Sequence, residues 1–183
     1  MSLRALPLRL VTGALVLGLG VAGSAVPLAA KVASITFGEL VRTADFIGLV
    51  RVERVRGIPL LRAPRATAAV LEPWKGAATR RVTYVAAPDW ICDISGAATG
   101  ELAVVFLDGG RLAHSGRGRM TAFTRDGRRL VEVWPEVRLP DGLRAEPGLG
   151  SFTSGVAIDD LRDAIGREGG GSIHRHATAA VTP

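Results

Sequence analysis

Arginine carries most of the chemistry that this sequence offers. The 183 residues include 23 Lys and Arg against 17 Asp and Glu, a formal net charge of +6, and nearly all of the cations are arginines. A glycine-rich stretch after residue 108 holds a cluster of them. A guanidinium presents a planar fork of donors that suits phosphate and carboxylate groups. We therefore consider five residues to be candidates for anion binding: Arg117, Arg119, Arg125, Arg128 and Arg129.

The alternative reading of this cluster is an ordinary solvated hairpin face with no partner. In either case the arginine heads are expected to be in solvent. Replacing Arg117, Arg119, Arg128 and Arg129 with Ser should then leave the fold intact, because surface substitutions usually change stability by only about 0.5 kcal/mol each.

Cys92 is the candidate thiol and the only cysteine in the chain, so a disulfide within the chain and a multi-cysteine zinc site are both excluded. Reactive thiols need a nearby cation or a helix N-terminus, whereas Cys92 lies between Asp89 and Asp93. A buried small residue, the relic of a lost disulfide, or half of an intermolecular disulfide are the alternatives to a reactive group.

Histidine and aspartate offer only weak signals for metal binding or catalysis. The motif at 174–176 has an arginine between its two histidines and sparse carboxylates nearby. Helix capping and a solvated face explain the aspartates at 159, 160 and 163. His114 and Ser115 are adjacent, which seldom gives the geometry of a catalytic pair. We expect no catalytic, metal or cofactor site, and no cofactor.

Residues 1–30 have the pattern of an export signal. Arg4 and Arg9 precede an uncharged run from Leu10 to Val26, and small residues up to Ala30 provide a cleavage site. An uncleaved membrane anchor is the alternative, because the apolar stretch is about long enough to span a bilayer. The pattern predicts an exported protein, periplasmic or extracellular.

A short helix is expected directly before the first strand. Thr36 and Glu39 have the spacing of a capping box, and Ile35 and Leu40 have that of a hydrophobic staple. Apolar residues then recur at helical spacing, so one face of this helix should be buried.

Strand-like runs follow this helix, and the first and fourth are continuously apolar, so they should be central and covered on both faces. Asp126-Gly127 is a strong hairpin signal between the last two. A second short helix carries Ile158, Leu161 and Ile165 on one face and should stop at Gly166. The six strand-like runs are Phe46 to Val55, Thr67 to Trp74, Arg81 to Ala87, Glu101 to Leu107, Arg119 to Thr124 and Arg129 to Val137.

These elements predict a mainly β fold, a small OB-like antiparallel barrel of five to six strands with a short helix before the first strand and another near the C-terminus. The expected domain limits are 1–30 for the signal, 31–168 for the barrel and 169–183 for a flexible tail.

The order of three motifs resembles the netrin-type module of the tissue inhibitors of metalloproteinases, and more closely a class of uncharacterised exported bacterial proteins of that type. The motifs are Thr43-Ala44-Asp45-Phe46-Ile47 where a helix ends and runs into a strand, Val70-Leu71-Glu72-Pro73-Trp74-Lys75-Gly76, and Cys92 ahead of the segment from Gly100 to Leu107. The resemblance covers roughly residues 36–108 and implies the OB-type barrel. It does not imply protease inhibition, because no cysteine lies near the expected mature start.

The function expected from the sequence is that of an exported, non-enzymatic binding or interaction module. Its partner would be a protein or an anionic component of the cell envelope; nucleic acid is not expected, because export and few aromatic residues argue against it. The alternative is a cell-envelope hydrolase or a thiol-dependent enzyme with an unrecognised site.

Overall fold

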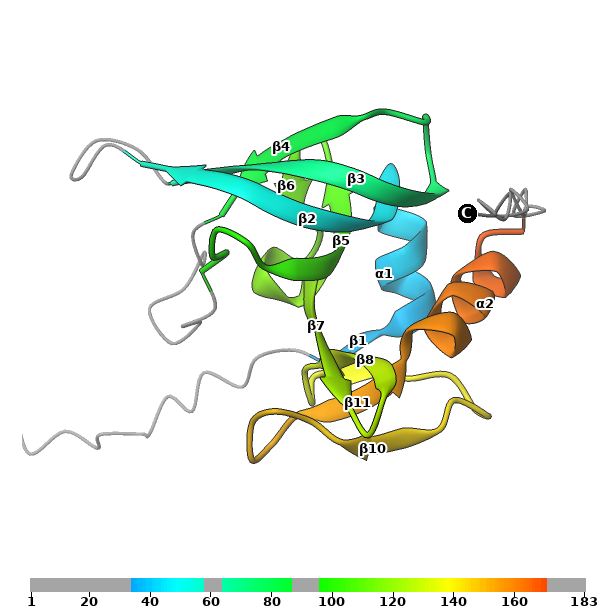
Figure 1. Ribbon diagram of the computed structural model, residues 1–183. Coiled ribbons are helices and arrows are strands. Elements are labelled where there is room, and N and C mark those ends of the chain that lie inside the picture. The colour runs from blue at the N-terminus through cyan, green and yellow to red at the C-terminus, as the bar shows by residue number, and fades with distance from the viewer. Residues whose placement is uncertain (1–33, 58–63, 87–95, 171–183) are drawn as a thin grey trace, which may run out of the picture. The chain divides into compact units, whose positions relative to one another are not determined.

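The computed structural model of the chain describes residues 34–57, 64–86 and 96–170, and its main feature is one large antiparallel β-sheet (Figure 1). A mainly β fold with two helices is thereby confirmed. The sheet contains nine strands: β2 (Phe46–Arg56), β3 (Arg65–Lys75), β4 (Arg81–Val85), β5 (Leu102–Asp108), β6 (Arg111–Leu112), β7 (Arg119–Arg125), β8 (Arg128–Val133), β10 (Ala145–Pro147) and β11 (Ser154–Ala157).

The prediction of a barrel of five to six strands was wrong. The strand order is β10-β11-β8-β7-β5-β2-β3-β4, with β6 paired to β5 on the side, and the described residues contain no ladder that closes this sheet into a ring. Two of the extra strands were not expected: β10 lies within residues 135–150, a Pro/Gly-rich stretch without a strand pattern, and β11 follows that stretch. They extend the sheet beyond β8 by pairing antiparallel to it and to each other.

The central position of the two continuously apolar strands is confirmed. β2 pairs with β3 on one side and with β5 on the other, and β5 also pairs with β7. Ile47 of β2 and Phe106 of β5 contribute to a core that includes both helices, whereas Val50 and Val105 contribute to a second core. Both faces of these strands are therefore covered, which explains why their sequences do not alternate.

Helix α1 (Phe37–Thr43) begins as its capping motif predicts: the Thr36 hydroxyl accepts a hydrogen bond of 3.1 Å from the Glu39 N–H. The other end of α1 has a partner that the sequence did not suggest. The Lys75 ammonium, at the end of β3, donates to the carbonyls of Val41 and Ala44 at 2.7 and 2.6 Å. These bonds satisfy carbonyls that a helix C-terminus leaves without partners.

The predicted hairpin is confirmed, since β7 and β8 pair through a turn in which Asp126 and Gly127 both have positive φ. The predicted strand from Arg129 to Val137 is broken. β8 ends at Val133, a turn closes from Trp134 to Val137, and β9 (Val137–Arg138) pairs in parallel with β1 (Ile35–Thr36). Pro135 lacks the N–H that a continuous strand needs.

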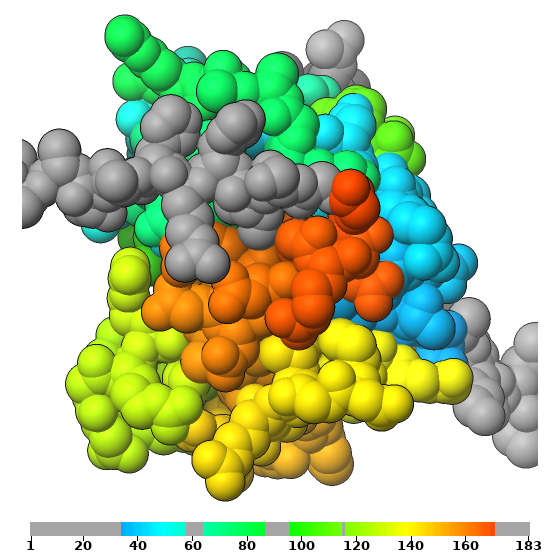
Figure 2. Space-filling model, turned by 90° about the vertical axis from the view of Figure 1, so that its right-hand side faces the viewer, coloured from blue at the N-terminus to red at the C-terminus, as the bar shows by residue number. Residues whose placement is uncertain are grey.

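Helix α2 (Ile158–Glu168) is longer than the sequence predicted, because Gly166 lies inside it rather than at its end. Its buried face continues to Ile165, and the Gly169 N–H donates to the carbonyl of that residue. Figure 2 shows α2 beside α1. Arg162 of α2 also pairs with Glu72 of β3 at 2.9 Å, so the helix is tied to the sheet.

Candidate anion-binding surface

The structure disperses the five predicted anion-binding arginines instead of gathering them in one solvated patch. Arg119 is the clearest departure, because only 5% of its side chain is exposed. Its guanidinium donates to the Glu101 carboxylate, which is 7% exposed and also accepts a hydrogen bond of 3.0 Å from the Thr121 hydroxyl. The expectation that the Arg119 head is in solvent is therefore wrong, and its charge is used inside the fold.

Arg117 and Arg125 also have partners within the fold. Arg117 is 16% exposed and lies 3.9 Å from the Glu136 carboxylate. The Arg125 guanidinium donates to the carbonyls of Pro147 and Gly148, and its centre lies 5.3 Å from the ring centroid of Phe123. These two cations hold loops and strands in place.

Arg128 and Arg129 are the exposed members of the set. Arg128 pairs with Glu146 at 2.5 Å, while no hydrogen bond or ion pair to Arg129 is seen from the described part of the chain. Anion binding at the hairpin stays a prediction for these two residues. A patch of five solvated arginines does not exist there.

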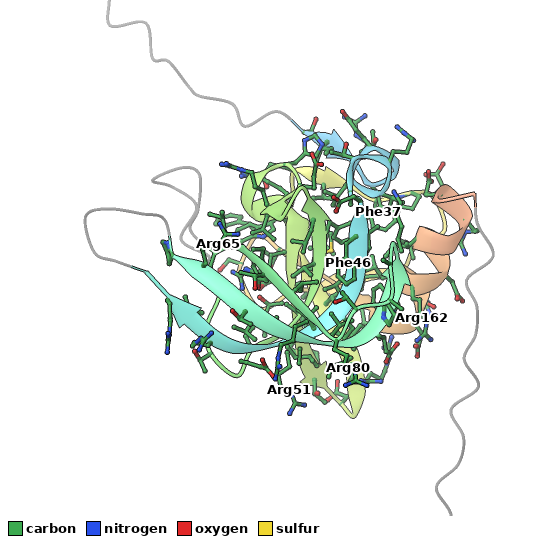
Figure 3. The ribbon with its side chains drawn as sticks, turned by 90° about the horizontal axis from the view of Figure 1, so that it is seen from above. Phe37, Phe46, Arg51, Arg65, Arg80 and Arg162 are labelled. Carbon is green, nitrogen blue, oxygen red and sulfur yellow. The ribbon has the colours of Figure 1, made fainter. Side chains whose placement is uncertain are left out.

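A different set of arginines is brought together by β2, β3 and β4. On β3, Ala66 and Ala68 are buried, so the alternating residues Arg65, Thr67 and Ala69 lie on the opposite, outer side. Figure 3 labels Arg51, Arg65 and Arg80 on or next to these strands. We call the outer side the arginine face and define its cations as Arg51, Arg54, Arg56, Arg65 and Arg81, all exposed.

The register of the strands sets the spacing of these cations. Arg51 and Arg81 lie on either side of Ala69, which pairs with both, and Arg56 pairs directly with Arg65. Strands in a sheet are about 4.8 Å apart and same-face residues about 7 Å apart along a strand. The cations of the arginine face thus form three rows that run across the strands: Arg56 with Arg65, Arg54 beside Thr67, and Arg51 with Arg81 on either side of Ala69. The side chains of Thr67 and Ala69 within these rows are small.

A β-bulge in β2 makes this face possible. Val52 pairs with Ala68 and Arg54 pairs with Thr67, so Glu53 is an extra residue between two paired positions. The extra residue shifts the alternation by one, which keeps Val52 buried and places both Glu53 and Arg54 outside.

Glu53 is the one carboxylate within these rows. Its oxygen lies 2.8 Å from the Arg81 Nε, and this hydrogen bond, with the charges of Arg81 and Arg54, lowers the pKa of Glu53. Like charges placed directly opposite each other destabilise a sheet, as for Arg56 and Arg65. Five cations against one carboxylate give the arginine face a positive potential, which an anion would relieve.

The spacing of the valines in residues 51–56 indicates a bulged strand, which a search for regular alternation does not detect. The segment Arg51-Val-Glu-Arg-Val-Arg56 places its two valines three residues apart, which breaks the two-residue period of a regular strand. Reading it as a bulged strand would have placed both valines inside and every charge outside. The pairing of Arg65 and Arg81 with this strand is not visible in the sequence.

The other candidate residues do not form a second site in the described part of the chain. Cys92, His174 and His176 lie outside the described residues, as do residues 1–30. His114 is exposed, and its Nε2 lies 3.3 Å from the Thr43 hydroxyl. Asp159 pairs with Arg162 at 2.6 Å. The described residues hold no group of three His, Cys, Asp or Glu side chains arranged to bind a metal.

Comparison of the chain with family models, with curated proteins and with solved structures finds no match. The resemblance to netrin-type modules accordingly stays a prediction. Neither of the helices described is long and apolar enough to cross a membrane.

Proposed function

We propose that this protein is an exported, non-enzymatic binding module, and that the arginine face is where it binds an anionic component of the cell envelope. The observation that supports the proposal most is the charge balance of that face, with five exposed arginines against the single carboxylate of Glu53. The pattern of residues 1–30, a positive start followed by an uncharged apolar run and small residues, supports export.

The chemistry of the face favours a ligand with several negative charges along its length. Cation rows about 7 Å apart along β2 and β3 can each meet one phosphate or carboxylate of an extended polymer. Arg51, Arg54 and Arg56 have no hydrogen bond or ion pair within the described residues, so their donors are free to form bidentate contacts with a ligand. Small side chains within the rows let such a ligand lie close to the strands.

The proposal is tested by comparing variants on immobilised heparin, a convenient polyanion. The triple variant R51S/R54S/R56S removes three cations from the arginine face. Its matched control, R42S/R144S/R167S, removes three exposed cations that lie elsewhere. A third variant, R128S/R129S, tests the hairpin arginines.

The face variant should elute at clearly lower salt than the parent, because it has lost cations that contact heparin and salt screens the contacts that remain. The control should elute close to the parent, because the three cations it lacks make no contact with heparin. Equal shifts for the face variant and its control would show that net charge alone drives retention. A shift confined to R128S/R129S would move the binding surface to the hairpin. Either result would overturn the proposal.

A further inference from the structure

The loop between β10 and β11, residues 148–153, carries the two most exposed large apolar side chains of the described chain. Phe152 is 85% exposed and Leu149 is 57% exposed. The loop projects beyond its two strands (Figure 1). Water contact with a phenylalanine ring is unfavourable, so a position that holds the ring in solvent needs a physical reason.

The loop is held in this shape by hydrogen bonds. The Gly148 N–H donates to the Thr153 carbonyl at 2.9 Å, and the Thr153 N–H donates to the Gly150 carbonyl at 3.3 Å. The Glu132 carboxylate of β8 accepts from the Thr153 hydroxyl at 2.7 Å and from the Gly150 N–H at 3.0 Å. Arg125 holds the two carbonyls at the start of the loop. Phe152 and Leu149 are therefore held outward by the tethered backbone.

Close packing at the base of the loop also indicates that the backbone holds Phe152 and Leu149 outward. A Cβ atom added to Gly148 would lie 2.2 Å from the Thr153 hydroxyl oxygen and 2.7 Å from the Thr153 carbonyl carbon. Only glycine fits at this position, so the two ends of the loop are locked together.

We propose that this loop inserts into the surface of an anionic lipid bilayer, with Phe152 and Leu149 entering the boundary between headgroups and acyl chains. No charged residue lies between Glu146 and Asp159, so insertion does not bury a charge of the loop itself. Several backbone groups of the loop are already hydrogen-bonded internally, which lowers the cost of leaving water. The inference goes beyond the proposed function and does not rest on it.

The size of the apolar tip favours a lipid surface over a protein partner. Phe and Leu together offer at most about 400 Å², whereas a stable protein interface needs about 800 Å² from each partner. A bilayer needs no complementary pocket. The net charge, +6 for the full chain and +4 without Arg4 and Arg9 of the export signal, favours anionic headgroups. The charge at the base of the loop itself is balanced, because the Arg125 guanidinium and the Glu132 carboxylate both contact it.

The test uses the full chain carrying Phe152→Trp and vesicles of phosphatidylcholine and phosphatidylglycerol, with and without bromine-labelled acyl chains. Tryptophan quenching beyond that of the parent protein reports the depth of residue 152 itself. Any lipid binding by residues 1–30 is common to both proteins and cancels in this comparison. We expect added quenching and a blue shift of the emission on vesicle addition.

Binding strength is measured with the same vesicles by flotation. Leu149→Ser with Phe152→Ser should lower the partition coefficient by about tenfold or more. The control Leu71→Ser alters the remaining exposed large apolar residue of the described chain, 46% exposed on β3, and should leave partitioning unchanged.

Three outcomes would overturn the inference: no added quenching in the Phe152→Trp protein, equal partitioning of the double variant and the parent, or loss of partitioning by the arginine-face variant alone. Dimers at sedimentation equilibrium that disappear in the double variant would instead assign the tip to contact between two copies of the chain.

Discussion

Arg119 and Glu101 form an ion pair in which both side chains are almost completely buried, at 5% and 7% exposure. The pair joins β7 to the residue that precedes β5. The second oxygen of Glu101 accepts a hydrogen bond of 2.8 Å from the Ala98 N–H, so the carboxylate also orders the turn before the strand. Arg119, which the sequence suggested would be in solvent, is thus part of the interior.

Replacing Arg119 with Met should destabilise the fold by about 3 to 5 kcal/mol, because the Glu101 charge would remain buried without its main partner. The double variant R119M/E101L should recover most of this loss, since a buried pair is often replaced by apolar side chains at little cost. Urea unfolding curves measure both values. Arg129→Ser is the control and should change stability by no more than about 0.5 kcal/mol. An Arg119→Met protein as stable as the parent would contradict the burial of this charge.

Tyr84 should titrate far above the ordinary range for tyrosine. Its side chain is fully buried, and burial together with the nearby Glu101 charge raises the pKa of the hydroxyl to about 12 from 10.0, with Arg119 partly opposing the shift. Tyr84 is the only tyrosine, so absorbance at 295 nm follows this group alone. The native protein should show ionisation near pH 12, and the urea-unfolded protein near pH 10.

The same shift predicts how stability depends on pH. Above pH 10 the unfolded chain loses the Tyr84 proton while the folded chain keeps it, so the free energy of unfolding should fall between pH 10 and about 12. A shift of this size corresponds to about 3 kcal/mol. In Tyr84→Phe this part of the decline should be absent, because that variant has no phenol to ionise. The hydroxyl has no hydrogen-bond partner among the described residues, so the variant should be no less stable than the parent at pH 7.

Lys75 should contribute strongly to stability through the end of α1. Replacing it with Met keeps the apolar stem and removes the donors to Val41 and Ala44, which should cost about 2 to 3 kcal/mol. Arg144→Met removes an exposed cation and should be nearly neutral, which separates the loss of these hydrogen bonds from a change in net charge. Urea denaturation measures both variants. Equal stability of the two variants would show that the helix end does not need Lys75.

Two glycines with positive φ should respond differently to Ala. Gly127 has φ +74° and open space around it, so Gly127→Ala should cost only the backbone strain, about 1 kcal/mol. Gly76 has φ +88°, and an added Cβ would lie 2.4 Å from the Asp45 carbonyl oxygen. Gly76→Ala should therefore cost about 3 kcal/mol or more, because backbone must move. Thermal unfolding compares them, and equal shifts in Tm would contradict the close contact at Gly76.

Local features of the fold were predictable because a few neighbouring residues determine them. Thr36 and Glu39 specify the start of α1 through one hydrogen bond across three residues. Asp126 and Gly127 specify a hairpin because their order permits positive φ at both positions. The continuous apolar runs of β2 and β5 indicated strands covered on both faces. Gly166 misled the prediction of α2, since burial of Ile165 outweighed the weak helix propensity of glycine.

The cap that begins α1, the β7–β8 turn and the central strands could be read from the sequence, because each depends on residues close together in the chain. The exposure of each arginine depends instead on contacts between distant segments of the chain. Arg119 is buried because β7 places it beside Glu101, eighteen residues earlier, while Arg51, Arg65 and Arg81 share a face because three strands pair in a particular register. The residues next to a charged side chain in the sequence do not show which distant residue it pairs with. A shift of one residue in strand register also moves every side chain of the strand to the other face. For that reason composition revealed the abundance of arginine, and only strand pairing revealed the arginine face.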